Sequence, residues 1–225
     1  AFIHPRGESR MNRTALTRAA LLAASIVLVS GAPAGAQDAA PTALALGSKA
    51  PMATTKMKTA SGKNVSIADV KGAKGTLVVF TCNACPYAKK WEERIVKLGN
   101  EAARKGIGVI AINANDPAVN ATDDYANMVT RAKERSMKYA YALDATSDIA
   151  RAFGATRTPE AFLFDAAGKL VYHGTVDDNC DDASAVKQPY LANAVWAVAS
   201  GKAVPVAETR SIGCGIKFRA AKSAS

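Results

Sequence analysis

The sequence predicts an α/β fold, because strand-like apolar runs alternate with helical segments along a chain of 225 residues. The runs at 76–81 and 107–114 are apolar on both faces, as expected of strands buried on both sides of a sheet. Apolar residues make up 49% and charged residues 21% of the chain, which excludes disordered, collagen-like and coiled-coil proteins. The length is sufficient for one domain with a full hydrophobic core.

The apolar pattern and the turn residues predict the individual elements in order. A turn at 60–63 joins two short extended pieces, and Gly99-Asn100 is expected to end the first long helix. The last two strands are expected to form a hairpin. The predicted elements are strand 76–81, helix 86–100, strand 107–114, helix 123–135, strand 139–143, helix 148–153, strands 161–164 and 170–173, and helix 188–200.

Residues 11–36 have the pattern of a secretory signal: basic residues, the apolar run 19–29, and a small-residue cleavage site at Ala34-Gly35-Ala36. The run is too short to span a bilayer of about 30 Å. We therefore expect export, with the periplasm as the compartment, and no membrane insertion after cleavage. An uncleaved N-terminal anchor is the alternative. Residues 1–10 precede the signal.

The remaining chain is expected to comprise a flexible leader at 37–46, a domain at 47–205 and a C-terminal tail at 206–225. The formal net charge is +10, but its basic residues are scattered. Aromatic residues, at 6%, are not interleaved with them. Nucleic-acid binding is therefore not expected.

Cys82 and Cys85 follow directly after the first buried strand, and Pro86 comes next. A Cys-x-x-Cys pair between a strand and a helix indicates thiol–disulfide exchange. We expect Cys82 at the N-terminus of the helix, where the helix dipole favours a thiolate, and Cys85 one turn further in. Cys82 would attack and Cys85 would resolve the mixed disulfide. An inert structural disulfide or half of a zinc site is the alternative, although structural zinc needs four ligands.

Thr158-Pro159 precedes the strand at 161–164. A proline at this position can be cis. If it lies beside the cysteine pair, the backbone of Thr158 would be free to pair with an extended substrate.

These elements together resemble the thioredoxin-like superfamily. The stretch Phe80-Thr-Cys-Asn-Ala-Cys-Pro-Tyr87 is similar to redoxins of the peroxiredoxin-like kind, in the alkyl hydroperoxide reductase/thiol-specific antioxidant group. Residues 47–51, 172–178 and 204–217 carry the rest of the resemblance. It implies a central mixed sheet flanked by helices, with Cys82 as nucleophile, Cys85 as resolving thiol and Pro159 as the cis-proline. It also implies a thiol–disulfide oxidoreductase with an antioxidant role, whose only cofactor is its redox-active disulfide.

Three positions depart from the family pattern. Ala84 stands where relatives often have His, which predicts a less stabilised thiolate and a less oxidising pair. Thr76 stands where thioredoxin has a buried acid. Val79 stands where peroxiredoxins have Thr three residues before the peroxidatic Cys, which argues against peroxidase activity.

Cys180 and Cys214 are single cysteines. The simplest pairing joins them to each other and leaves Cys82 with Cys85. Their disulfide would either hold the tail in place or act as a second redox pair that relays electrons to Cys85. Cys180 lies among the acids of 177–182, which form a solvated loop or, as an alternative, a cation site.

His173 allows a different class of function. Together with Cys82 and Cys85 it could form a copper set, as in copper chaperones of the thioredoxin fold. A thiol peroxidase is a third possibility. For the oxidoreductase, the expected partners are protein or small-molecule thiols and disulfides, with a membrane electron donor as a further candidate.

Overall fold

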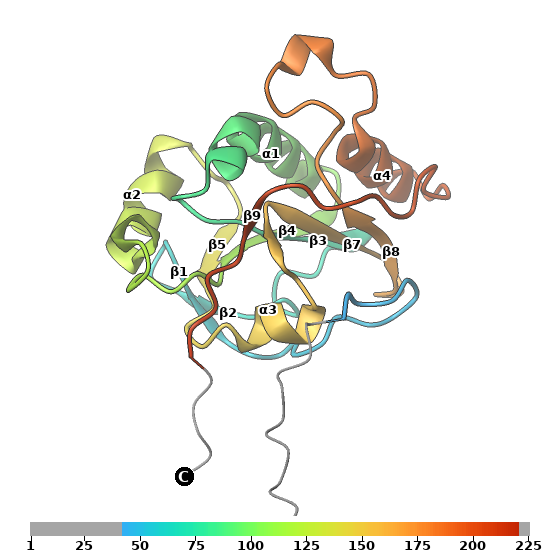
Figure 1. The fold of residues 1–225 in the computed structure, drawn as a ribbon. Coiled ribbons are helices and arrows are strands. Elements are labelled where there is room, and N and C mark those ends of the chain that lie inside the picture. The colour runs from blue at the N-terminus through green and yellow to red at the C-terminus, as the bar shows by residue number, and fades with distance from the viewer. Residues whose placement is uncertain (1–41, 221–225) are drawn as a thin grey trace, which may run out of the picture. The chain divides into compact units, whose positions relative to one another are not determined.

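The computed structural model describes residues 42–220 of the chain, and the predicted signal sequence at 11–36 lies outside them. A seven-stranded mixed sheet has the strand order β2-β1-β5-β4-β3-β7-β8 (Figure 1). Its strands are β1 (Met57–Thr59), β2 (Asn64–Val65), β3 (Gly75–Phe80), β4 (Ile107–Asn113), β5 (Ala140–Leu143), β7 (Glu160–Asp165) and β8 (Leu170–Gly174). A separate two-stranded sheet joins β6 (Arg157–Thr158) to β9 (Cys214–Gly215).

The strand β3 lies inside the sheet, between β4 and β7. It pairs in parallel with β4 and antiparallel with β7, and all six of its residues are buried. The unbroken apolar run of its sequence is explained by this position, because both faces of the strand are covered. The predicted hairpin at the end of the sheet is also confirmed, since β7 pairs antiparallel with β8.

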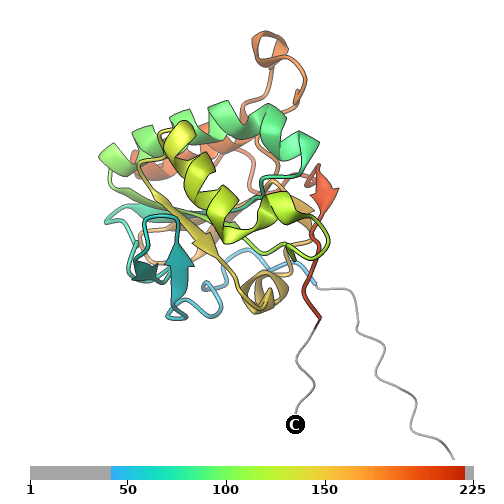
Figure 2. The ribbon, with the colours of Figure 1, turned by 90° about the vertical axis from the view of Figure 1, so that its left-hand side faces the viewer.

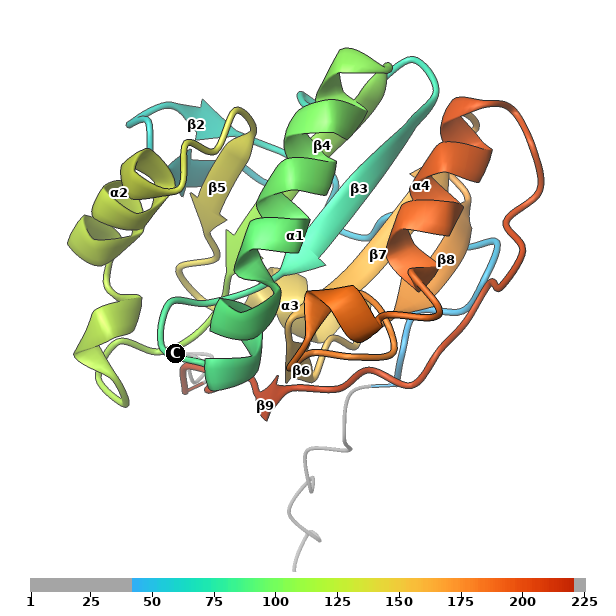
Figure 3. The same cartoon turned by 90° about the horizontal axis from the view of Figure 1, so that it is seen from above.

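Helices cover both faces of the sheet (Figures 2 and 3). The helices α1 (Pro86–Arg104), α2 (Tyr125–Glu134) and α4 (Tyr190–Ala199) lie on one face, and α3 (Asp148–Phe153) lies on the other. Two 3₁₀ turns, Ala121–Asp123 and Ala183–Ala185, lie in the connections. The predicted α/β class and mixed sheet are confirmed. Between residues 42 and 220, no helix has the length and apolar character needed to cross a bilayer.

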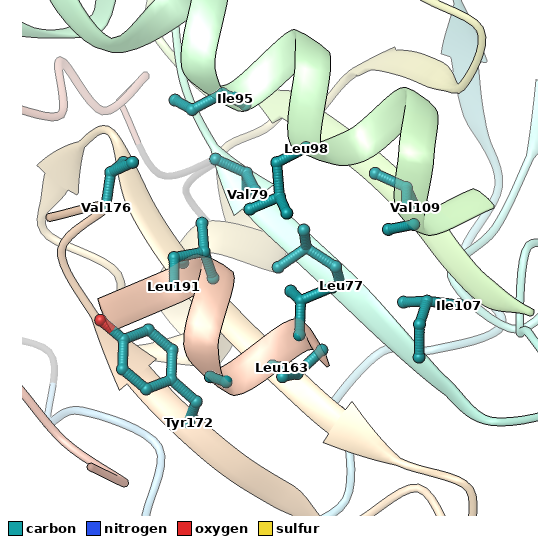
Figure 4. Packing of buried hydrophobic residues seen from close by; sticks show 14 of the residues in the cluster. Leu77, Val79, Ile95, Leu98, Ile107, Val109, Leu163, Tyr172, Val176 and Leu191 are labelled. Atoms are coloured by element: carbon teal, nitrogen blue, oxygen red, sulfur yellow. The ribbon is translucent and has the colours of Figure 1, made fainter. Parts of the chain in front are cut away.

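Alternate residues of β3 enter different cores. Leu77 and Val79 pack under α1 and α4 (Figure 4), whereas Val78 and Phe80 pack against α3. This alternation follows from the two-residue period of a strand. Packing on both faces fixes the C-terminal end of β3, and the segment that carries the two cysteines follows directly after it.

The helix α1 continues to Arg104, past the stop predicted at Gly99-Asn100. Gly99 serves packing instead of termination. A Cβ atom there would lie 2.6 Å from the ring of Tyr139, so only glycine lets the helix approach this side chain.

The leader and the tail lie against the domain in the parts that the structure describes. Residues 42–46 were predicted to be flexible, but Leu44 donates its N–H to the carbonyl of Phe153 at 3.1 Å and packs against the α3-side core. In the tail, Ile216 is buried in the same core. Two residues earlier, Cys214 packs against Cys82 and Cys85, so the tail passes close to the cysteine pair.

Candidate active site

The two cysteines occupy the short loop between β3 and α1. Cys85 is the N-cap of α1, with an extended backbone, and its Sγ accepts the N–H of Ala88 at 3.4 Å. Cys82 lies three residues earlier, outside the helix. The prediction that Cys82 lies at the helix N-terminus and Cys85 one turn inside was therefore wrong. Pro86 explains the difference, because it suits the first helical position and keeps the preceding residue out of the helical conformation.

Both thiols are buried, and their pKa values shift in opposite directions. The pKa of Cys85 is lowered, first by its hydrogen bond with the Cys82 thiol and also by the Ala88 N–H. The pKa of Cys82 is raised by the same hydrogen bond, by burial and by the negative charge of Asp123. The helix N-terminus favours an anion on Cys85 as well. The cap position and the directions of the two pKa shifts therefore favour Cys85 as the thiolate of the pair.

Thr158 and Pro159 lie beside the pair, and the peptide bond between them is cis, as predicted. The Cys85 thiol donates to the carbonyl of Thr158 at 3.0 Å. The Cys82 thiol donates to Oγ1 of the same residue at 3.5 Å. Thr158 thus contacts both cysteines, which come from a segment more than seventy residues away.

The backbone of Thr158 is not free, in contrast to the expectation from the sequence. It pairs in register with Cys214, so that β9 of the tail lies along β6 at the end of the molecule where α1 begins (Figure 3). Gly213 makes this approach possible, since a Cβ there would lie 2.2 Å from the Thr158 carbonyl oxygen. The tail therefore occupies the edge at which an extended substrate was expected to pair.

All four cysteines are free thiols in the structure, and the predicted Cys180–Cys214 disulfide is not formed. Cys214 packs against the cluster of Cys82, Cys85 and Ala88. Cys180 instead packs against the core beneath α1 and α4. The two cysteines expected to pair therefore belong to different parts of the molecule.

Asp123 is a buried carboxylate that sequence reasoning missed as a site residue. Its Oδ1 accepts the backbone N–H groups of Asn83 at 2.6 Å and Ala84 at 3.0 Å, between the two cysteines. Its Oδ2 accepts the side-chain amide of Asn115 at 2.8 Å. Position 76 is a threonine and not the buried acid of thioredoxin. Asp123, from the 3₁₀ turn Ala121–Asp123, places a negative charge beside the loop that carries the two cysteines. In the sequence, Asp123 and Asp124 form a pair of acids before a predicted helix, and this pattern indicates a helix cap rather than a residue of the site.

The side chain of Asn83 fixes the same loop from the other side. Its amide donates to the carbonyl of Thr122 at 2.8 Å, and its Oδ1 accepts the hydroxyl of Tyr141 at 2.9 Å. Tyr141 is fully buried, and burial raises the pKa of its hydroxyl, which keeps it a hydrogen-bond donor. The Cys-x-x-Cys loop is therefore held by buried polar contacts rather than left mobile.

Glu160 and His173 form a buried pair behind the cis-proline. His173 Nε2 lies 2.7 Å from Glu160 Oε1, and its ring stacks on Phe162 with centroids 4.5 Å apart. Glu160 Oε2 also accepts the N–H groups of Thr156 and Arg157, both at 2.8 Å. The pair thus holds the strand that leads to Thr158.

The copper set of Cys82, Cys85 and His173 is not assembled. Within residues 42–220, no three His, Cys, Asp or Glu side chains are placed to hold a metal ion. Because His173 is hydrogen-bonded to Glu160, the copper-chaperone alternative is not supported by the geometry.

The acidic loop is partly docked. Asp177 is buried, accepts the indole N–H of Trp91 at 2.7 Å and pairs with Arg94. Asp181 forms an exposed ion pair with Lys90. These acids bind side chains of α1, so the loop packs against this helix. Among the residues that the structure describes, the loop does not form the cation site considered as an alternative.

A mixed sheet with a cysteine pair at the start of its first covering helix, facing a cis-proline, defines a protein of the thioredoxin-like fold. The sequence profile of the Redoxin family matches residues 45–188, and the chain belongs to this family. The resemblance expected from the residues around Cys82 and Cys85 is thereby confirmed.

The chain is similar to proteins of known and unknown activity. Thiol-disulfide oxidoreductase ResA of Bacillus thuringiensis subsp. konkukian is 27% identical over 110 residues, which are 49% of this chain and 59% of that protein. A hypothetical protein of Sinorhizobium meliloti has a solved structure with 33% identity and a TM-score of 0.73, covering 80% of this chain and 97% of that one. An uncharacterized conserved protein of Geobacillus kaustophilus is 34% identical, with a TM-score of 0.73 and coverage of 80% and 94%.

Proposed function

We propose that this chain is a thiol–disulfide oxidoreductase in which Cys85 attacks and Cys82 resolves. The observation that carries the proposal is the position of Cys85 at the N-cap of α1, with its Sγ accepting the N–H of Ala88. A thiolate is the attacking species in disulfide exchange, and a helix N-terminus stabilises it. The similarity to ResA supports the same activity. The proposal reverses the roles that the sequence had suggested for the two cysteines.

The exchange proceeds in two balanced steps. The Cys85 thiolate attacks one sulfur of a partner disulfide, a Cys85–partner bond forms, and the other partner sulfur leaves as a thiolate that takes up a proton. Cys82 then gives up its proton and attacks Sγ of Cys85. The Cys82–Cys85 disulfide forms, the second partner sulfur leaves, and the partner is reduced by two electrons while the chain is oxidised.

The surroundings of the pair favour protein or small-molecule thiols and disulfides as partners. Tyr87 and Ile212 are exposed apolar side chains close in sequence to Cys85 and Cys214. Apolar contacts at the rim of a reactive thiol suit an extended peptide partner. We also propose that the exchange takes place outside the cytoplasm, on the basis of the signal pattern at 11–36.

Trapping of the mixed disulfide tests which cysteine attacks. We would compare Cys82→Ser/Cys214→Ser with Cys85→Ser/Cys214→Ser, because Cys214 contacts Cys85 and could resolve an adduct. Oxidised glutathione serves as the disulfide, and peptide mapping by mass spectrometry locates the adduct. We expect a glutathione adduct on Cys85 in the first variant and very little on Cys82 in the second. An adduct that forms only on Cys82 would restore the original roles, and the absence of any adduct would overturn the function.

The redox potential of the Cys82–Cys85 pair would decide the direction of electron flow. A value near about −270 mV identifies a reductase, and one near about −120 mV identifies a disulfide donor. A reductase needs an external dithiol to recharge it, for which we propose a membrane electron donor. The thiol peroxidase alternative stays a prediction, and consumption of hydrogen peroxide by the same two variants tests it.

A further inference from the structure

Cys214 lies at the active-site pair although it comes from the tail. It packs against Cys82, Cys85 and Ala88, and its own residue pairs in register with Thr158. Its carbonyl oxygen lies 3.5 Å from the Thr158 hydroxyl. Three of the four cysteines of this chain are therefore gathered around a single residue.

The thiols of Cys85 and Cys214 interact directly. Hydrogen bonding with the Cys214 thiol contributes to the lowered pKa of Cys85. The pKa of Cys214 is raised, mainly by burial and then by Cys85 itself. In this arrangement Cys214 is the protonated neighbour of a thiolate, as Cys82 is on the other side.

The tail is fastened on both sides of Cys214. Before it, Thr209 donates its N–H to the carbonyl of His173 at 3.0 Å. After it, Ile216 donates to the carbonyl of Thr156 and Lys217 donates to Oδ1 of Asn115, both at 2.9 Å. The position of Cys214 is therefore determined by the fold and does not depend on a chance contact of a loose end.

We propose that Cys214 is a second resolving thiol for Cys85. This inference rests on the proposed function. In the mixed disulfide, Cys214 loses its proton and attacks Sγ of Cys85. A Cys85–Cys214 bond forms, the Cys85–partner bond breaks, and the partner sulfur leaves with a proton. The chain is oxidised by two electrons, as in resolution by Cys82, but the disulfide now joins the helix start to the tail.

Cys180 provides a matched comparison because it is the one cysteine outside the cluster. The variant Cys82→Ser/Cys180→Ser keeps Cys85 and Cys214, and Cys82→Ser/Cys214→Ser keeps Cys85 and Cys180. Each variant has two thiols, and in both of them the Cys82 thiol next to Cys85 is removed. Both would be exposed to oxidised glutathione, quenched with acid and mapped by mass spectrometry.

We expect the variant with Cys214 to end as a Cys85–Cys214 disulfide, with at least about tenfold less glutathione adduct than the variant with Cys180, because a neighbouring thiol reacts intramolecularly. Equal amounts of adduct in both variants, with no linked peptide, would overturn the role of Cys214 alone. No glutathione adduct in Cys82→Ser/Cys214→Ser, the variant that keeps Cys180, would overturn the proposed function instead. Should the change Cys82→Ser prevent folding, Cys82→Ala replaces it in both variants, because a small apolar residue suits this buried position.

Discussion

The Sγ atom of Cys85 lies 3.0 Å from the carbonyl oxygen of Thr158, and its thiol donates to that oxygen. This hydrogen bond exists only while Cys85 is protonated. When the thiolate forms, the carbonyl loses this donor, while Thr158 stays paired with Cys214 of the tail. A partner chain can therefore use this backbone acceptor, next to the reacting sulfur, only after β9 has moved away from β6.

The first prediction concerns the pH dependence of alkylation. The pKa of Cys85 is lowered, whereas those of Cys82, Cys180 and Cys214 are raised. Cys85 therefore stays a thiolate at pH values below the ordinary thiol pKa of about 8.5, and the other three become thiolates only above it. At pH 7 we expect iodoacetamide to modify Cys85 at least about tenfold faster than any other cysteine. Mass spectrometry of quenched digests gives the four rates, and fastest modification of Cys82 would contradict the assignment.

The second prediction concerns the glycines that flank Cys214. Gly213→Ala places a Cβ 2.2 Å from the Thr158 carbonyl oxygen, whereas Gly215→Ala meets no atom within 4 Å. We expect Gly213→Ala to destabilise the reduced protein by about 1–3 kcal/mol, and Gly215→Ala to change its stability by less than about 0.5 kcal/mol. Urea unfolding measures both. Gly213→Ala should also reduce the yield of the Cys85–Cys214 disulfide, and equal behaviour of the two variants would contradict the close approach of the tail.

The third prediction concerns the charge of Asp123, which raises the pKa of Cys82. Asp123→Asn removes this charge, so the pKa of Cys82 should fall and its alkylation at pH 8 should accelerate. The amide also fits two backbone donors and the Asn115 amide less well, at a cost of about 1–3 kcal/mol in unfolding free energy.

Asp124→Asn is the matched control for Asp123. Asp124 caps α2 by accepting the N–H of Asn127, and asparagine caps a helix about equally well. We expect neither the stability nor the rate of Cys82 alkylation to change in this variant. If it matched Asp123→Asn in its effect on Cys82, the acceleration would not arise from the buried charge.

The fourth prediction concerns the buried pair of Glu160 and His173. Glu160→Ala leaves His173 without its hydrogen-bond partner and two backbone N–H groups without their acceptor, so we expect a loss of about 3 kcal/mol or more in unfolding free energy. Glu160→Gln should recover most of it, because the amide oxygen can accept from the backbone and the amide nitrogen can hydrogen-bond with the imidazole. Thermal and urea unfolding measure the difference. Glu208→Ala is the control: its carboxylate is mostly exposed and 3.7 Å from His173 Nδ1, and it should contribute less than about 1 kcal/mol.

The sequence was sufficient to predict the elements that carry the cysteine pair and the cis-proline. The apolar run of β3 and the proline that starts α1 located the cysteine pair between a buried strand and a helix, and Thr158-Pro159 indicated the cis-proline. Pro86, which starts α1, also indicated which of the two cysteines lies next to the helix, and the sequence analysis overlooked this. Because Pro86 keeps Cys85 in an extended conformation, the helix had to begin after the second cysteine, and the first could not lie at its N-terminus.

The remaining contacts depend on the folded chain. Asp123 reaches Asn83 across forty residues, and beside Asp124 it has the sequence pattern of a helix cap. The strands β6 and β9 have two residues each, which is too short for any apolar period to show. The placement of Cys214 at the active-site pair was therefore beyond the reach of pattern analysis.

The pairing of β6 with β9 also bears on the binding of substrates. A peptide that adds to the edge of β6 must first displace a strand of the same chain, whose local concentration does not depend on dilution. The apparent affinity for such a peptide is then lower than its intrinsic affinity by the fraction of molecules in which the tail has moved away. Two residues in register are few to displace, so a long peptide with apolar side chains would compete well and a short polar one poorly.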